Sequence, residues 1–143
     1  MTKEEKELLL KDLCARLPYG VKLGFYASAT KQTYVCTLLG LEPQEEEPII
    51  AKTENGCFYM LAGNVKPYLF PLSSMTEEQK KECSIELSII DAFINGEIYL
   101  SEDEGLTVYE ITEIFDWLNA NHFDYRGLIE KGLAIDASGL NIY

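Results

Sequence analysis

The sequence has few basic residues for its length. Its 143 residues include 12 Lys and Arg against 24 Asp and Glu, which gives a formal net charge of −12. Residues 1–72 hold 8 basic and 9 acidic side chains, whereas residues 73–143 hold 4 and 15. The second half should therefore repel nucleic acid and anionic membranes. It would attract a basic partner, or it serves only as a solvated surface that keeps the protein soluble.

Several motifs of enzymes and metal sites are missing. The chain has no Gly-rich phosphate loop and no Gly-x-Ser-x-Gly nucleophile turn. The acidic segment 101–105 lacks the spacing of an EF-hand, so we expect no metal. We expect no cofactor either. Four cysteines form no Cys-x-x-Cys pair and sit beside apolar residues, which predicts buried free thiols. These cysteines are Cys14, Cys36, Cys57 and Cys83.

Long apolar runs are also missing. None approaches the roughly 20 residues that a membrane-spanning helix needs. Residues 1–20 are charged and helical in pattern, unlike a secretory signal peptide. With no secretory signal, reduced cysteines are expected, and so is a cytoplasmic protein without a membrane partner.

The stretch from Val65 to Thr76 separates two parts of the chain with different predicted secondary structure. Pro67 and Pro71 fix an extended backbone, and the residues around them are too apolar for a free linker. The chain reads as short strands before this stretch and as helices after it. We therefore predict one α+β domain over residues 1–143, with this stretch as the buried seam. Residues 1–72 form a helix plus β half, and residues 73–143 an acidic helical half.

Helices are predicted where capping residues precede apolar residues at helical spacing. Thr2 with Glu5 and Thr76 with Gln79 have the spacing of capping boxes. The leucine stripe of the first helix should face the core. A short helix should begin at Asp124, and the apolar tail 133–143 should dock on the body. The predicted helices cover 3–16, 77–95, 108–120 and 124–131.

Between the first two helices the period changes to that of strands. Asn55-Gly56 predicts a type I′ hairpin turn, which requires positive φ at both residues. Short twisted strands of this kind predict a small antiparallel sheet or an SH3-like barrel. The predicted strands cover 19–27, 33–39, 48–53, 57–61 and 65–69.

Two groups of residues are candidates for an interaction surface. The first is a set of tyrosines on the predicted sheet that would form an aromatic face, or would pack half-buried for structural reasons alone. Its members are Tyr19, Tyr26, Tyr34 and Tyr59. The second is the set His122, Asp124 and Arg126, which surrounds the only histidine.

An enzyme centred on this second set is one alternative, because histidine is the commonest general base. The other alternative is structural. His122 would be a cation at a helix end, Asp124 a helix cap and Arg126 the partner of a nearby carboxylate. We favour the structural alternative and expect no enzyme.

Two segments resemble a family of short uncharacterised proteins from gut Bacteroidetes and from their phages and integrated elements. Residues 66–78 read Lys-Pro-Tyr-Leu-Phe-Pro-Leu-Ser-Ser-Met-Thr-Glu-Glu, and residues 117–133 read Trp-Leu-Asn-Ala-Asn-His-Phe-Asp-Tyr-Arg-Gly-Leu-Ile-Glu-Lys-Gly-Leu. The start at 13–22 is similar as well, and residues 23–64 match less. The resemblance implies a cytoplasmic protein of phage or mobile-element origin, and it carries no activity or catalytic residue.

Our leading hypothesis is a non-enzymatic interaction or regulatory protein. It would bind an unknown partner protein, with a basic partner favoured by the charge, through the acidic helical surface or the small sheet. The alternative is a role related to nucleic acid, either DNA mimicry by the acidic half or weak binding by the sheet. Direct binding of nucleic acid is disfavoured because residues 1–72 are nearly neutral.

Overall fold

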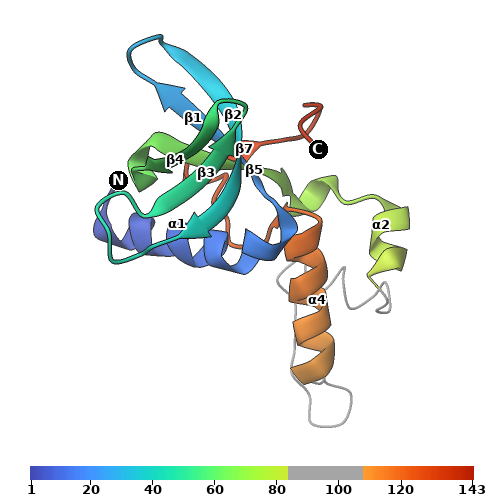
Figure 1. The fold of residues 1–143 in the computed structure, drawn as a ribbon. Coiled ribbons are helices and arrows are strands. Elements are labelled where there is room, and N and C mark those ends of the chain that lie inside the picture. Colours follow the sequence, from blue (N-terminus) through green and yellow to red (C-terminus); the bar gives the residue numbers. More distant parts are fainter. Residues whose placement is uncertain (84–107) are drawn as a thin grey trace.

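The chain has an α+β fold in which a curled sheet packs on one long helix (Figure 1). The computed structural model describes residues 1–83 and 108–143. The described helices are α1 (Lys3–Arg16), α2 (Glu77–Glu82) and α4 (Val108–Ala120). Short 3₁₀ helices are η1 (Leu17–Tyr19), η2 (Ala62–Asn64) and η3 (Leu72–Ser74). The strands are β1 (Lys22–Ala27), β2 (Gln32–Leu41), β3 (Ile49–Thr53), β4 (Gly56–Met60), β5 (Val65–Pro71), β6 (Phe123–Asp124) and β7 (Ile135–Asp136).

The helices with clear caps begin where the sequence predicts. Thr2 and Thr76 each form a complete capping box, so α1 and α2 start at the expected residues. α4 has the predicted bounds. α2 ends at Glu82, and the rest of the helix predicted over 77–95 lies outside the described residues, as does the acidic segment 101–105.

The short helix predicted over 124–131 is wrong. The backbone at Phe123 and Asp124 pairs in parallel with β5. The following residues form a turn in which the N–H groups of Leu133 and Ala134 both donate to the carbonyl of Leu128. This turn leads into β7, so strand pairing with β5 replaces the helix.

The sheet has the strand order β4-β3-β2-β1-β5-β6, and β7 also pairs with β5. β1 to β4 form an antiparallel meander, and β5 returns antiparallel to β1. The predicted antiparallel sheet is confirmed for these strands, while β6 and β7 run parallel to β5 and make the sheet mixed. Among the described strands β4 pairs only with β3, so the ladder does not close into a ring.

The turn between β3 and β4 lies one residue earlier than predicted. Thr53 pairs with Gly56, so Glu54 and Asn55 are the central residues. Neither has a positive φ, and Gly56 takes a φ of 123° as the first residue of β4. The type I′ prediction is therefore wrong, although the glycine still provides the unusual backbone angle.

The predicted seam, Val65 to Thr76, comprises β5, η3 and the two residues before α2. The chain buries Tyr68 and Leu69 there, between β1 and the two short parallel strands. Beyond the pair of Leu23 and Pro67, the ladder with β1 is completed by a side chain of the docked tail. The hydroxyl of Tyr143 accepts the N–H of Lys22 at 3.2 Å and donates to the carbonyl of Tyr68 at 2.7 Å. The tail is thus tied into the sheet.

Two apolar clusters form the core. The first joins the α1 leucines to the sheet, and the second joins α4 to Met75, Cys83 and Phe123. The apolar stripes of α1 and α4 therefore face inward, as predicted. The prediction of buried thiols is right for Cys36 and Cys83 and wrong for the other two cysteines. Cys14 lies on the outer side of α1, and Cys57 lies on an edge strand, so both are exposed.

Candidate functional site

The inner face of the sheet, defined as the side that packs on α1, continues past the part that the helix covers. Leu23, Cys36 and Ala51 lie on this face and are buried in the core. Alternation along the strands places Phe25, Tyr34 and Phe58 on the same face. The register agrees, because Phe25 pairs with Tyr34 and Phe58 pairs with Ala51.

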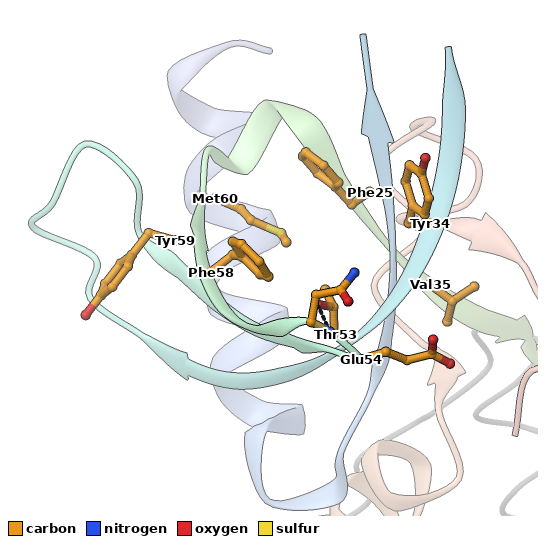
Figure 2. Close-up of a pocket in the computed structure, with 9 residues that line it drawn as sticks. Phe25, Tyr34, Val35, Thr53, Glu54, Phe58, Tyr59 and Met60 are labelled. Atoms are coloured by element: carbon orange, nitrogen blue, oxygen red, sulfur yellow. Dashed lines mark hydrogen bonds between the residues drawn. The ribbon is translucent and has the colours of Figure 1, made fainter. Parts of the chain in front are cut away.

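The uncovered end of this face is apolar and open to solvent. Tyr34 is 43% exposed and Phe58 45% exposed, whereas Met60, the next inner-face residue along β4, is 5% exposed. Together with Phe25 they surround a cavity of about 710 Å³, which we call the sheet hollow. In Figure 2, Phe58 and Met60 point into the hollow from β4. Its lining residues are Phe25, Tyr34, Val35, Thr53, Glu54, Asn55, Phe58, Tyr59 and Met60.

One wall of the sheet hollow is an unprotected strand edge. β4 has the sequence Gly-Cys-Phe-Tyr-Met and carries no charge. Thr53 and Gly56 form the hydrogen-bonded pair that closes the hairpin. Starting with the residue after Gly56, every second residue of β4 directs its N–H and C=O away from β3. These residues are Cys57 and Tyr59, and no described strand pairs with them. Proteins usually protect such edges with charges, prolines or covering segments.

The other side of β4 faces an acidic loop. Tyr59 and Leu61 line a second cavity of about 410 Å³, which we call the acidic hollow. The remaining lining residues are four glutamates from the loop between β2 and β3: Glu42, Glu45, Glu46 and Glu47. The edge strand is thus flanked by an apolar hollow on the inner face and an acidic hollow on the outer face.

The four candidate tyrosines do not form one face. Tyr34 lies on the inner face, while Tyr26 follows Phe25 on β1 and so faces outward. Tyr59 lies at the rim of the sheet hollow but points away from it (Figure 2). Tyr19 belongs to η1 and is 37% exposed. The aromatic face expected from the sequence is therefore reduced to Tyr34, joined by residues that sequence reasoning did not select. The sequence did contain a signal for Phe58: it alternates with Tyr59 in a strand without charged residues, which places the two aromatic rings on opposite faces.

His122 is buried and neutral, not a cation at a helix end. It follows α4 with a φ of 60°, and its ring stacks on Tyr143 with 4.1 Å between ring centroids. Burial lowers the pKa of His122 to about 4, and the positive charges of Arg16 and Lys22 contribute to the shift. The prediction that a charged His122 complements the helix dipole is therefore wrong.

Arg126 has the structural role that the alternative gave it, whereas Asp124 caps a turn and not a helix. The Asp124 carboxylate accepts the backbone N–H groups of Leu128 at 2.9 Å and Ile129 at 2.7 Å, so it caps a turn in place of the predicted helix. Arg126 pairs with Asp12, with 3.3 Å between Nε and Oδ1.

His122, Asp124 and Arg126 thus have different partners, and the hollows described above are lined by other residues.

A buried ion pair escaped the sequence-based reasoning. Asp12 and Arg16 are both fully buried on α1. The Nε of Arg16 donates to Oδ2 of Asp12 at 2.7 Å, and its Nη2 donates to Oδ1 at 3.1 Å and to the Phe123 carbonyl at 2.8 Å. The i,i+4 spacing of opposite charges was a visible signal, although exposed helical pairs share it. The pair joins α1 to β6.

Within residues 1–83 and 108–143, no group of His, Cys, Asp and Glu converges to hold a metal ion, and no helix is long and apolar enough to span a membrane. Comparisons of the chain with models of protein families, with curated proteins and with solved structures found no match.

Proposed function

We propose that the protein is a non-enzymatic interaction module that binds an extended segment of a partner protein in the sheet hollow, beside β4. The observation that carries the proposal is that the inner face of the sheet extends beyond the part that α1 covers, and that apolar side chains continue onto the uncovered part. Half-exposed Tyr34 and Phe58 line the same hollow as Phe25 and buried Met60. Exposed apolar surfaces of this kind are typical of binding sites, and aromatic side chains dominate interface energies.

The charge around the site favours a basic partner. Glu54 lines the sheet hollow, and the four glutamates of the acidic hollow lie on the other side of the same strand. The whole chain has a net charge of −12. This potential would steer a basic segment toward the site and speed its association. We include in the proposal a cytoplasmic setting and a phage or mobile-element origin, which the quoted motifs support.

Site-specific photo-crosslinking in the native cells tests the proposal. Phe58 is replaced by the photo-reactive residue p-benzoylphenylalanine, and Tyr26 receives the same replacement as a matched control. Both are exposed aromatic residues on strands, but Tyr26 lies on the outer face of β1. We expect illumination to give an adduct of discrete mass at position 58 and none at 26. Mass spectrometry should map the adduct to a basic, extended segment of another protein.

Two results would contradict the proposal. One is the absence of any adduct at position 58 in cells where the variant is folded and abundant. The other is a set of equal adducts at both positions, which would show that exposed aromatic rings in general collect neighbours. An adduct that forms only between two copies of this chain would replace the proposed partner with self-association.

A further inference from the structure

We propose that the partner segment binds by adding a strand to the free edge of β4, and that its side chains alternate between apolar and basic. The inference rests on the proposed function and adds the geometry of binding and the chemistry of the partner. Three observations carry it: an edge of β4 with which no described strand pairs, the sheet hollow on one side and the acidic hollow on the other.

The backbone of β4 provides the hydrogen-bonding half of the site. Cys57 and Tyr59 each present an N–H and a C=O on the edge that no described strand occupies. An extended peptide satisfies such groups by pairing as a further strand, which is a common mode of peptide recognition. The five residues of β4 span about 17 Å, so the edge accommodates a segment of similar length.

The two hollows determine which side chains such a strand carries. Successive side chains of a strand point to opposite faces of the sheet. Every second side chain of the added strand would lie over the inner face, beside Phe58 and Met60 in the sheet hollow. The intervening side chains would lie beside Tyr59 and the glutamates of the acidic hollow. Apolar side chains fit the first environment, and Lys or Arg fits the second.

The same charges disfavour a second copy of this chain as the occupant. β4 itself carries no basic residue, so pairing β4 with β4 would leave each acidic hollow without a charge partner. Basic side chains of a different segment would complement these hollows. A different protein with a basic segment therefore fits the edge better.

Selection from a random display library of peptides of about ten residues, long enough to span β4, gives the first test. Wild-type protein is the bait, and binders are counter-screened on Phe58→Ser and on the control Tyr26→Ser. We expect the enriched peptides to alternate apolar residues with Lys or Arg. They should bind the wild type and Tyr26→Ser, but not Phe58→Ser.

Backbone methylation of one enriched synthetic peptide gives the second test, on unaltered wild-type protein. Methylating an amide that faces β4 removes a hydrogen bond, so binding should weaken about tenfold. Methylating the alternate amides, which face away, should change the dissociation constant less than about twofold. The sensitivity should therefore alternate along the peptide.

Charge variants give the third test. Glu45→Gln, Glu46→Gln and Glu47→Gln together should weaken binding of the same peptide about threefold to tenfold at low salt. A matched triple variant removes exposed glutamates elsewhere and should leave binding unchanged. It combines Glu78→Gln, Glu113→Gln and Glu130→Gln.

The outcomes separate the inference from the proposed function. Peptides that need Phe58 but show no alternation, or that tolerate every methylation equally, would overturn strand addition and leave a groove-binding module. If no enriched peptide depends on Phe58, both proposals fail. Self-association of the free chain that Phe58→Ser abolishes would also overturn the inference, because the edge would then belong to a second copy.

Discussion

Replacing Asp12 by alanine should strongly destabilise the fold. Asp12 accepts two hydrogen bonds from Arg16, at 2.7 and 3.1 Å, and also contacts Arg126 at 3.3 Å. Without the carboxylate, the fully buried Arg16 guanidinium keeps the Phe123 carbonyl as a hydrogen-bond acceptor and the Tyr125 ring, 5.5 Å from its central carbon, but has no negative charge beside it among the described residues. Removing one partner of a buried ion pair costs about 3–5 kcal/mol, because the remaining charge stays buried without compensation. We expect a loss in that range.

Urea denaturation at neutral pH measures this loss. Trp117 is the only tryptophan and stacks on Phe123, so its fluorescence reports the contact between α4 and β6. The matched control is Glu7→Ala, since Glu7 pairs with Lys3 at the same i,i+4 spacing but is exposed. That change should cost less than about 0.5 kcal/mol. Equal midpoints for Asp12→Ala and Glu7→Ala would refute the reasoning, because burial would then have no effect.

Two further predictions concern the docked tail and the residue beneath it. Unfolded His122 binds a proton with a pKa near 6.5 and folded His122 near 4, so the unfolded state holds more protons between these values and stability falls as pH drops. From pH 7 to pH 5 the wild type should lose about 2 kcal/mol more stability than His122→Asn, a variant whose asparagine tolerates the positive φ. Denaturation at both pH values measures the difference. Equal losses would contradict the buried neutral ring. Tyr143→Phe removes the hydroxyl that joins β1 to β5 and should lower the free energy of unfolding by about 1–2 kcal/mol. The control Tyr109→Phe, at a residue that is 71% exposed, should leave it almost unchanged. Indistinguishable melting midpoints for these two variants would show that the hydroxyl does not stabilise the ladder.

Local signals predicted where α1, α2 and α4 begin, and most of the strands. The capping boxes at Thr2 and Thr76 fix where α1 and α2 begin, since each involves residues three apart in the chain. The prolines of the seam likewise act on their own neighbours. The alternation of side chains located the strands within a few residues.

The rest of the fold depends on contacts between distant residues. The lowered pKa of His122 follows first from burial of the ring, on which Tyr143 stacks, and then from the positive charge of Arg16 on α1. Neither cause is visible in the sequence around His122. Phe123 and Asp124 form a strand only because β5 is available to pair with them. Sequence patterns of short range do not contain this information.

The candidate site was only partly predictable for the same reason. Tyr34 was selected as an aromatic strand residue, but Phe58 became relevant only once the structure showed where α1 stops covering the sheet. Likewise, only the strand order of the folded sheet identifies β4 as an edge strand. The acidic loop between β2 and β3 is relevant to binding because it lies beside that edge.

Amide hydrogen exchange at β4, read residue by residue by NMR, tests the central claim most directly. In the free protein, the amides of Cys57 and Tyr59 should exchange rapidly because they face the open edge, while those of Phe58 and Met60 should be protected by β3. Adding an enriched apolar–basic peptide should protect Cys57 and Tyr59. Continued rapid exchange of both amides at saturating peptide would contradict the account.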